Sequence, residues 1–230
     1  MHTFSKNITW IFILCFNILG IHLCSQPLVI ENYPELSKVN ELRKELLDIA
    51  DSQVGVRELT GNNDGPEIKE YLKSVGLKEG YPWCVAFVVW CHLQISYDFP
   101  IPNTAWSPAM FTSNVVYHKF HKRMSEWIPR GGEVGGIYYA SKKRVAHTLI
   151  IEKKFSKHFH TYEGNTSLLG AILDKMDLTQ KEKDEQDRDG IWVARKIRKP
   201  EDIYVASDYI GGAEIAKALR QKGRSKYFNK

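Results

Sequence analysis

Residues 80–95 read GYPWCVAFVVWCHLQI. Pro82 suits the first turn of a helix, because its missing N–H is one that this turn leaves unbonded in any case. The run that follows is apolar on nearly all sides, which predicts a helix buried in the core. Cys84 stands at the opening of this helix. Free N–H groups and the positive end of the helix dipole favour a thiolate there, so they lower the pKa of a cysteine.

Four cysteines occur in the chain, and two of them, Cys84 and Cys91, fall in the expected domain. On one helix they lie roughly 10 Å apart along the axis, beyond disulfide reach, so both are expected to be free. Cys91 is interpreted as a core residue. Cys84 has two interpretations: a small hydrophobe packed in the core, or a nucleophile whose neighbouring N–H groups stabilise an oxyanion.

Two further helices are expected before this stretch. Apolar residues recur at helical spacing over residues 42–54. Pro66 can begin a second helix, which Gly76 closes. The intervening loop contains Asn62 and Asp64, which are candidate substrate contacts because the loop lies close upstream of Cys84.

The same loop, NNDG at residues 62–65, invites a comparison with calcium loops. Aligned with the EF-hand pattern, its first ligand would be Thr60 and its last Tyr71, so the motif fails. We expect a surface turn that caps the helix at Pro66. A substrate-facing or calcium-binding loop stays open as the alternative, although the motif gives calcium no support.

Strand-like segments dominate the chain beyond Pro100. One more helix is expected at residues 107–121, followed by a glycine-rich turn at 130–136. The charged stretch 174–189 is interpreted as a solvated loop, and a short helix is expected at 213–221. Strands are predicted at residues 137–140, 146–152, 159–163 and 190–195. Helices first and antiparallel strands afterwards indicate an α+β domain.

A candidate base is found among the eight histidines. His147 opens the run HTLII, and a histidine at the mouth of a buried strand is held rigidly, as a general base must be. Glu163 and Asn165 close the next strand. Being two residues apart, they share a strand face, so both could reach the imidazole and fix its tautomer. The alternatives are a packing histidine and a strand-ending turn.

His158 and His160 alternate on one strand face, as metal ligands can. Two ligands without a third nearby make a weak zinc site, so we expect no metal and no other cofactor.

The N-terminal residues 1–25 are typical of an export signal, since Lys6 is the only charge and residues 8–23 are apolar. That run is short for a membrane span, which needs about 20 residues. Membrane attachment through these residues, or through a lipid on Cys24, stays open. We expect an exported protein of the periplasm, the cell envelope or the medium.

The net charge of +5 is modest. It favours an anionic surface such as a cell wall but is too small to indicate nucleic acid, and no basic block interleaved with aromatics is present. Nucleic acid is therefore not an expected partner.

Several segments together resemble the CHAP domains, the cysteine, histidine-dependent amidohydrolases/peptidases of phage lysins and bacterial wall hydrolases. The resemblance covers about residues 45–198. It is carried by YPWCVAFVVWC (81–91), TGNNDGPEIKEYLKSVG (60–76), GEVGGI (132–137), His147, EGN (163–165) and the strand at 190–195.

The resemblance implies a papain-like α+β fold, with N-terminal helices on an antiparallel sheet and the nucleophile at a helix N-terminus. It implies Cys84 as nucleophile, His147 as base and Glu163 as the residue that orients the imidazole. Asn165 becomes an additional polar partner. Two aromatic side chains, Trp83 and Tyr81, become walls of the substrate groove.

The implied substrate is peptidoglycan, cleaved at the muramoyl-L-alanine amide or within a stem or cross-bridge peptide, by a monomer. The expected organisation is a signal (1–25), a lead-in (26–41), a catalytic domain (42–198) and a basic extension (199–230). Two alternatives stay open. One is an NlpC-type endopeptidase, in which a histidine commonly takes the third position. The other is a non-catalytic secreted wall-binding protein, for which Cys84 would be buried far from His147.

Overall fold

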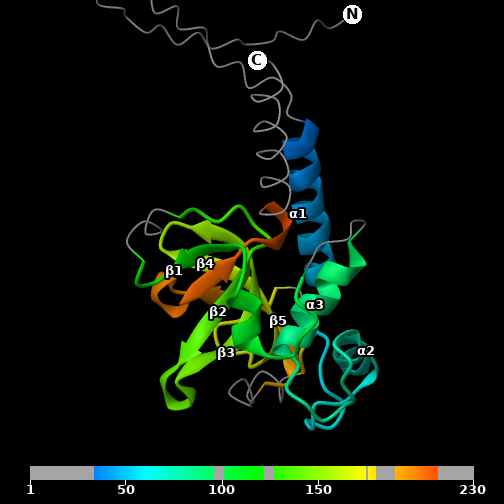
Figure 1. The fold of residues 1–230 in the computed structure, drawn as a ribbon. Coiled ribbons are helices and arrows are strands. Elements are labelled where there is room, and N and C mark those ends of the chain that lie inside the picture. The colour runs from blue at the N-terminus through cyan, green and yellow to red at the C-terminus, as the bar shows by residue number, and fades with distance from the viewer. Residues whose placement is uncertain (1–33, 96–100, 122–126, 175, 180–189, 212–230) are drawn as a thin grey trace, which may run out of the picture. The chain divides into compact units, whose positions relative to one another are not determined.

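An antiparallel sheet of six strands and a group of helices make up the described part of the chain (Figure 1). The computed structural model describes residues 34–95, 101–121, 127–174, 176–179 and 190–211. The expected export signal, Cys24 and the expected helix at 213–221 lie outside these residues, as does most of the charged loop. None of the helices within them has the length and hydrophobicity to cross a bilayer.

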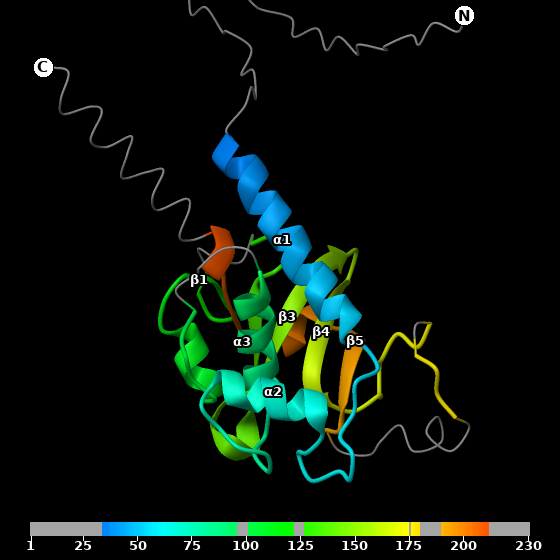
Figure 2. The same cartoon turned by 90° about the vertical axis from the view of Figure 1, so that its right-hand side faces the viewer.

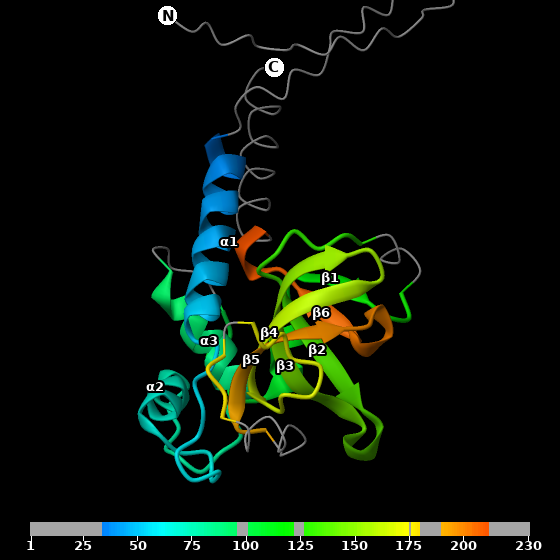
Figure 3. The ribbon, with the colours of Figure 1, turned by 180° about the vertical axis from the view of Figure 1, so that it is seen from behind.

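Each strand of the sheet runs antiparallel to its neighbours. The order across the sheet is β1-β6-β2-β3-β4-β5. The strands are β1 (Val115–His118), β2 (Val134–Tyr139), β3 (Arg144–Phe155), β4 (His158–Thr166), β5 (Trp192–Arg198) and β6 (Val205–Ser207). Figure 3 shows the sheet from behind, with the hairpin of β2 and β3 projecting from it. The predicted α+β class, with an antiparallel sheet, is confirmed.

The three α-helices of the described residues gather on one side of the sheet (Figure 2). They are α1 (Pro34–Ser52), α2 (Pro66–Ser74) and α3 (Cys84–Gln94). As predicted, α3 is buried on nearly all sides, and it begins at Cys84, two residues after Pro82. Its Phe87 is fully buried, which contributes about 2 kcal/mol to folding. The core around α3 contains Leu42, Leu46, Tyr71, Val134, Ile150, Tyr162 and Val193.

The predicted helix at residues 107–121 is wrong. A short 3-10 helix, η1 (Ser107–Phe111), is followed by strand β1. Asn114, with φ 53°, is in the left-handed region between them. The β-branched and aromatic sequence Val115-Val116-Tyr117 favours a strand, and β6 provides its hydrogen-bonding partner.

The folded unit also extends beyond the predicted boundaries 42 and 198. Helix α1 begins at Pro34, and β6 lies inside the sheet, between β1 and β2. A buried ion pair of Arg43 in α1 with Asp208, just after β6, joins the two ends. The first part of the predicted basic extension, 200–211, is therefore part of the domain.

Candidate active site

Cys84 is the first residue of α3 and lines a cavity of about 500 Å³ together with His147. Its side chain is largely buried, with 7% of the residue exposed. Helix α3 can approach the sheet closely because β4 has a glycine at the contact. A Cβ at Gly164 would lie 2.6 Å from the Cβ of Phe87 and 2.7 Å from the ring of Trp83. The close packing of α3 on β4 thus sets the position of the thiol.

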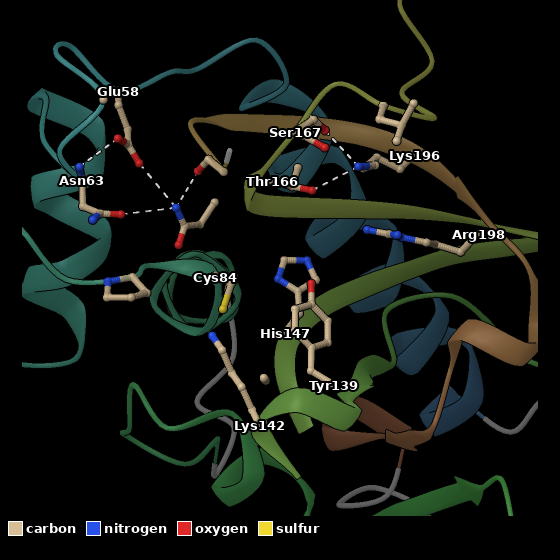
Figure 4. Close-up of a pocket in the computed structure, with 16 residues that line it drawn as sticks. Glu58, Asn63, Cys84, Tyr139, Lys142, His147, Thr166, Ser167, Lys196 and Arg198 are labelled. Atoms are coloured by element: carbon tan, nitrogen blue, oxygen red, sulfur yellow. Dashed lines mark hydrogen bonds between the residues drawn. The ribbon is translucent and has the colours of Figure 1, made fainter. Parts of the chain in front are cut away.

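His147 lies on β3 and faces Cys84 across the cavity, as Figure 4 shows. The imidazole Nε2 is 2.9 Å from Oε2 of Glu163, which leaves Nδ1 as the ring nitrogen on the thiol side. The side chains of Cys84 and His147 line the same cavity and lie close enough for each to shift the pKa of the other. The three residues therefore form a chain of contacts in the order thiol, imidazole, carboxylate.

Glu163 is completely buried on β4 and is held by charged and polar donors. Nε of Arg198 donates to it at 2.7 Å, Nη2 of the same guanidinium donates to its other oxygen, and Thr161 Oγ1 donates at 2.7 Å. Burial alone would raise the pKa of Glu163, but the bonds from Arg198 and His147 outweigh it and hold the pKa well below its usual range. The carboxylate is thus kept ionised.

The thiol and the imidazole shift each other's protonation. Burial alone would raise the pKa of Cys84, but the bond to His147, the N–H of Thr148 and the hydroxyl of Ser107 lower it below its usual range. Burial alone would lower the pKa of His147, but Cys84 and Glu163 raise it to about 9. Both directions favour a thiolate–imidazolium pair, which is the reactive form of a cysteine nucleophile.

Asn165 does not serve the imidazole as predicted. Its Oδ1 accepts the N–H of Trp83 at 3.1 Å, and its Nδ2 donates to the carbonyl of Gly190 and, at 3.3 Å, to Oδ1 of Asn63. The two-residue alternation with Glu163 fails because the pairing of β4 with β5 shifts between Glu163 and Thr166. Asn165 itself is left-handed, with φ 54°. It holds the segment that leads into Cys84.

The predicted role of Trp83 as a groove wall is wrong. The residue is fully buried, and its Nε1 donates to Oε1 of Glu58 at 2.8 Å. An indole gains most from burial when its N–H finds an acceptor, and Glu58 provides one. Tyr81 is 54% exposed but is not among the described residues that line the cavity.

Asn62 and Asp64 stabilise their own turn. Asp64 accepts the N–H and the hydroxyl of Thr60 at 3.0 and 2.8 Å, and Asn62 donates to the same hydroxyl at 2.8 Å. Two neighbours in the loop, Gly61 and Asn63, line the cavity instead. In the described ranges no group of three or more His, Cys, Asp or Glu side chains could hold a metal ion.

Other cavity residues carry charge or an aromatic ring and were missed by the sequence argument: Glu58, Tyr139, Lys142, Lys196 and Arg198. Lys196 and Arg198 alternate on β5, next to the strand of Glu163. Their spacing could have placed them on one face, but charged residues at a strand end usually face solvent.

Protein-family models, curated proteins and solved structures give no match to this chain. The geometry around Cys84 and the resemblance in sequence are the two indications of its function. Chemically, the arrangement provides a nucleophile, a base that can also act as an acid, and a carboxylate that orients the base.

Proposed function

We propose that the protein is a cysteine hydrolase of papain-like type that cleaves an amide bond in peptidoglycan. One observation carries the proposal: the thiol of Cys84, at the start of a buried helix, meets an imidazole whose other nitrogen is held by a buried carboxylate. The three groups have the order and contacts that acyl transfer to a cysteine requires.

In the first half of the reaction, the Cys84 thiolate attacks the carbonyl carbon of the scissile amide and forms a tetrahedral oxyanion. The N–H groups of the first turn of α3 have no partner within the helix, so they are donors available to that oxyanion. His147 then gives its proton to the leaving amine as the C–N bond breaks. A thioester on Cys84 is the product.

In the second half, water enters after the amine has left. His147 takes a proton from the water, the resulting hydroxide adds to the thioester carbonyl, and the C–S bond breaks to release a carboxylic acid. The thiolate–imidazolium pair is restored. Throughout, Glu163 keeps Nε2 of His147 oriented, and Arg198 neutralises the charge of Glu163.

The substrate class is supported by the resemblance to CHAP domains. Glu163 in the third position favours that branch over the NlpC type, in which a histidine commonly stands there. A non-catalytic wall-binding protein would leave Cys84 far from His147, and the position of both side chains in one cavity argues against it. The signal-like residues 1–25 and the net charge of +5 fit a protein exported to an anionic wall.

The test is digestion of purified peptidoglycan, followed by mass spectrometry of the soluble products. Wild-type protein should release fragments whose masses identify the bond and thereby separate amidase from endopeptidase. Cys84→Ser should release none and should lose reaction with iodoacetamide at this site, while Cys91→Ser, which changes a buried cysteine of the same helix, serves as the matched control. Unchanged wall under conditions where a known lysin works would contradict the proposal.

A further inference from the structure

The cavity around Cys84 is lined by more cationic than anionic side chains. Lys142, Lys196 and Arg198 line it, as does one carboxylate, Glu58. Arg198 is paired with Glu163. The two oxygens of Glu58 accept hydrogen bonds from the indole N–H of Trp83 and the backbone N–H of Asn63, both at 2.8 Å. Neither lysine has a carboxylate partner among the described residues.

Lys196 is the more constrained of the two lysines. Only 3% of the residue is exposed. Its Nζ donates to Thr166 Oγ1 at 3.2 Å and to the carbonyl of Ser167 at 2.9 Å, and both acceptors are neutral. An ammonium has three donors, so one is left for the cavity. Burial lowers the pKa of Lys196 to about 8, even though the nearby charge of Glu163 raises it, because a buried charge is costly when no carboxylate pairs with it directly. An anion bound in the cavity would accept the remaining hydrogen bond.

Lys142 approaches the cavity from another direction. It is the exposed last residue of η3 (Ala140–Lys142), the short 3-10 turn that joins β2 to β3. Its Nζ lies 5.9 Å from the ring centroid of Tyr139. In Figure 4 its side chain extends toward Cys84, whereas Lys196 lies beyond His147. A long exposed side chain can move toward a bound group, so Lys142 adds positive charge on the side of the thiol.

We propose that this cavity selects a substrate with a free carboxylate near the scissile amide, and that Lys196 binds this carboxylate with help from Lys142. The inference rests on the proposed function and names the chemistry of its substrate. A stem peptide offers such a group where a glutamate is joined through its side-chain carboxyl, because its α-carboxylate is then free. Amidation of that group removes the charge and leaves the shape nearly unchanged.

A structural role for Lys196 is the competing explanation, since its two bonds also fix the end of β4 at Thr166 and Ser167. The two explanations differ in what they predict for selectivity. A structural lysine affects all substrates alike. A lysine that binds the carboxylate affects only the difference in cleavage rate between the substrate with the carboxylate and the substrate with the carboxamide.

The experiment compares one peptidoglycan preparation before and after its carboxylates are converted to carboxamides with a carbodiimide and ammonia. The rate of release of new amino groups is measured on both. Wild-type protein should cleave the untreated wall about tenfold faster or more, as expected for a hydrogen bond to a charged group. Lys196→Met should bring the ratio of the two rates, untreated wall over amidated wall, close to one. Lys196→Arg should retain most of this preference, and Lys142→Gln should reduce it partly.

Lys69→Gln removes an exposed lysine of α2 that lies outside the cavity lining, so it controls for net charge and should keep the wild-type ratio. Equal rates on the two walls with wild-type protein would overturn the inference and leave the proposed function intact. A wild-type ratio that survives in a folded Lys196→Met variant would also overturn it. Release from neither wall would overturn the proposed function itself.

Discussion

Glu163 and Asn165 stand two residues apart on β4, yet they serve different halves of the site. Glu163 faces His147 and is surrounded by donors that keep it charged. Asn165 faces the loop before Cys84 and connects Trp83, Asn63 and Gly190 with neutral hydrogen bonds. Glu163 controls the protonation of His147, and Asn165 controls the position of the segment that leads into Cys84. Substitutions on the two sides should therefore differ in pH dependence as well as in size.

The largest effect is expected from Glu163→Gln. The amide cannot stabilise an imidazolium, and Arg198 loses its counter-ion, so kcat/KM should fall about 10³- to 10⁴-fold. The pKa of His147 should also move down from about 9 toward its ordinary value, because Glu163 is one cause of its elevation. The measurement is kcat/KM against pH. An unchanged profile would mean that Glu163 does not act through the imidazole.

The second-largest effect is expected in the pH dependence of hydrolysis by the wild-type protein. Since the pKa of His147 is raised to about 9, hydrolysis should fall about tenfold per unit above that pH, where the leaving amine loses its proton donor. Alkylation of Cys84 by iodoacetamide needs only the thiolate, so its rate should not fall. A parallel decline of both rates would contradict the assignment of His147 as the acid.

The raised pKa of His147 also makes the stability of the folded protein depend on pH. His147 binds its proton more tightly in the folded state, so its contribution is full below about pH 6.5 and is lost as the pH rises through about 9.

A smaller effect is expected from Asn165→Ala. It leaves the N–H of Trp83 without its acceptor, so the free energy of unfolding should drop by about 1–3 kcal/mol and kcat/KM by about tenfold. Hydrolysis should still fall only above about pH 9, because the substitution leaves the contacts of the His147 imidazole unchanged. Denaturant unfolding and the pH profile test the two parts. A shifted pH limit would place Asn165 on the imidazole side after all.

The smallest effect is expected from Asn62→Ala. Its hydrogen bond lies within an exposed turn, so stability should change by less than about 0.5 kcal/mol and kcat/KM by less than about twofold. Substrate-saturation kinetics check this. A large rise in KM would restore the predicted substrate contact at this loop.

The parts of the site that depend on local sequence were predictable. Pro82 and the apolar run after it placed Cys84 at the start of a buried helix, and the succession of predicted strands put Glu163 on the strand next to that of His147. The role of Asn165 was predicted wrongly because the pairing of β4 with β5 shifts after Glu163 and breaks the two-residue period, and no sequence pattern indicates that shift. Trp83 was misplaced because its buried acceptor, Glu58, is 25 residues away in sequence.

The cationic side chains of the cavity and strand β6 were not predicted, for a different reason. In the sequence, Lys196 and Arg198 have the charge typical of a strand end that faces solvent. Only the structure shows that they bond to β4, Lys196 to Thr166 and Arg198 to Glu163. Strand β6 is only three residues long, and its place between β1 and β2 follows from pairing with segments far away in sequence. Such pairing depends on the tertiary fold and leaves no local pattern.

That position of β6 has a consequence for the order of assembly. A chain is synthesised from its N-terminus, and among the described strands β1 pairs only with β6, about 90 residues later. Tyr209, just beyond β6, also donates to the carbonyl of Met110 in η1, the turn that carries Ser107 to the thiol. Contacts so distant in sequence form late and slowly. The surroundings of Cys84 are thus completed only once nearly the whole domain has been made, and a nascent or truncated chain lacks the finished site.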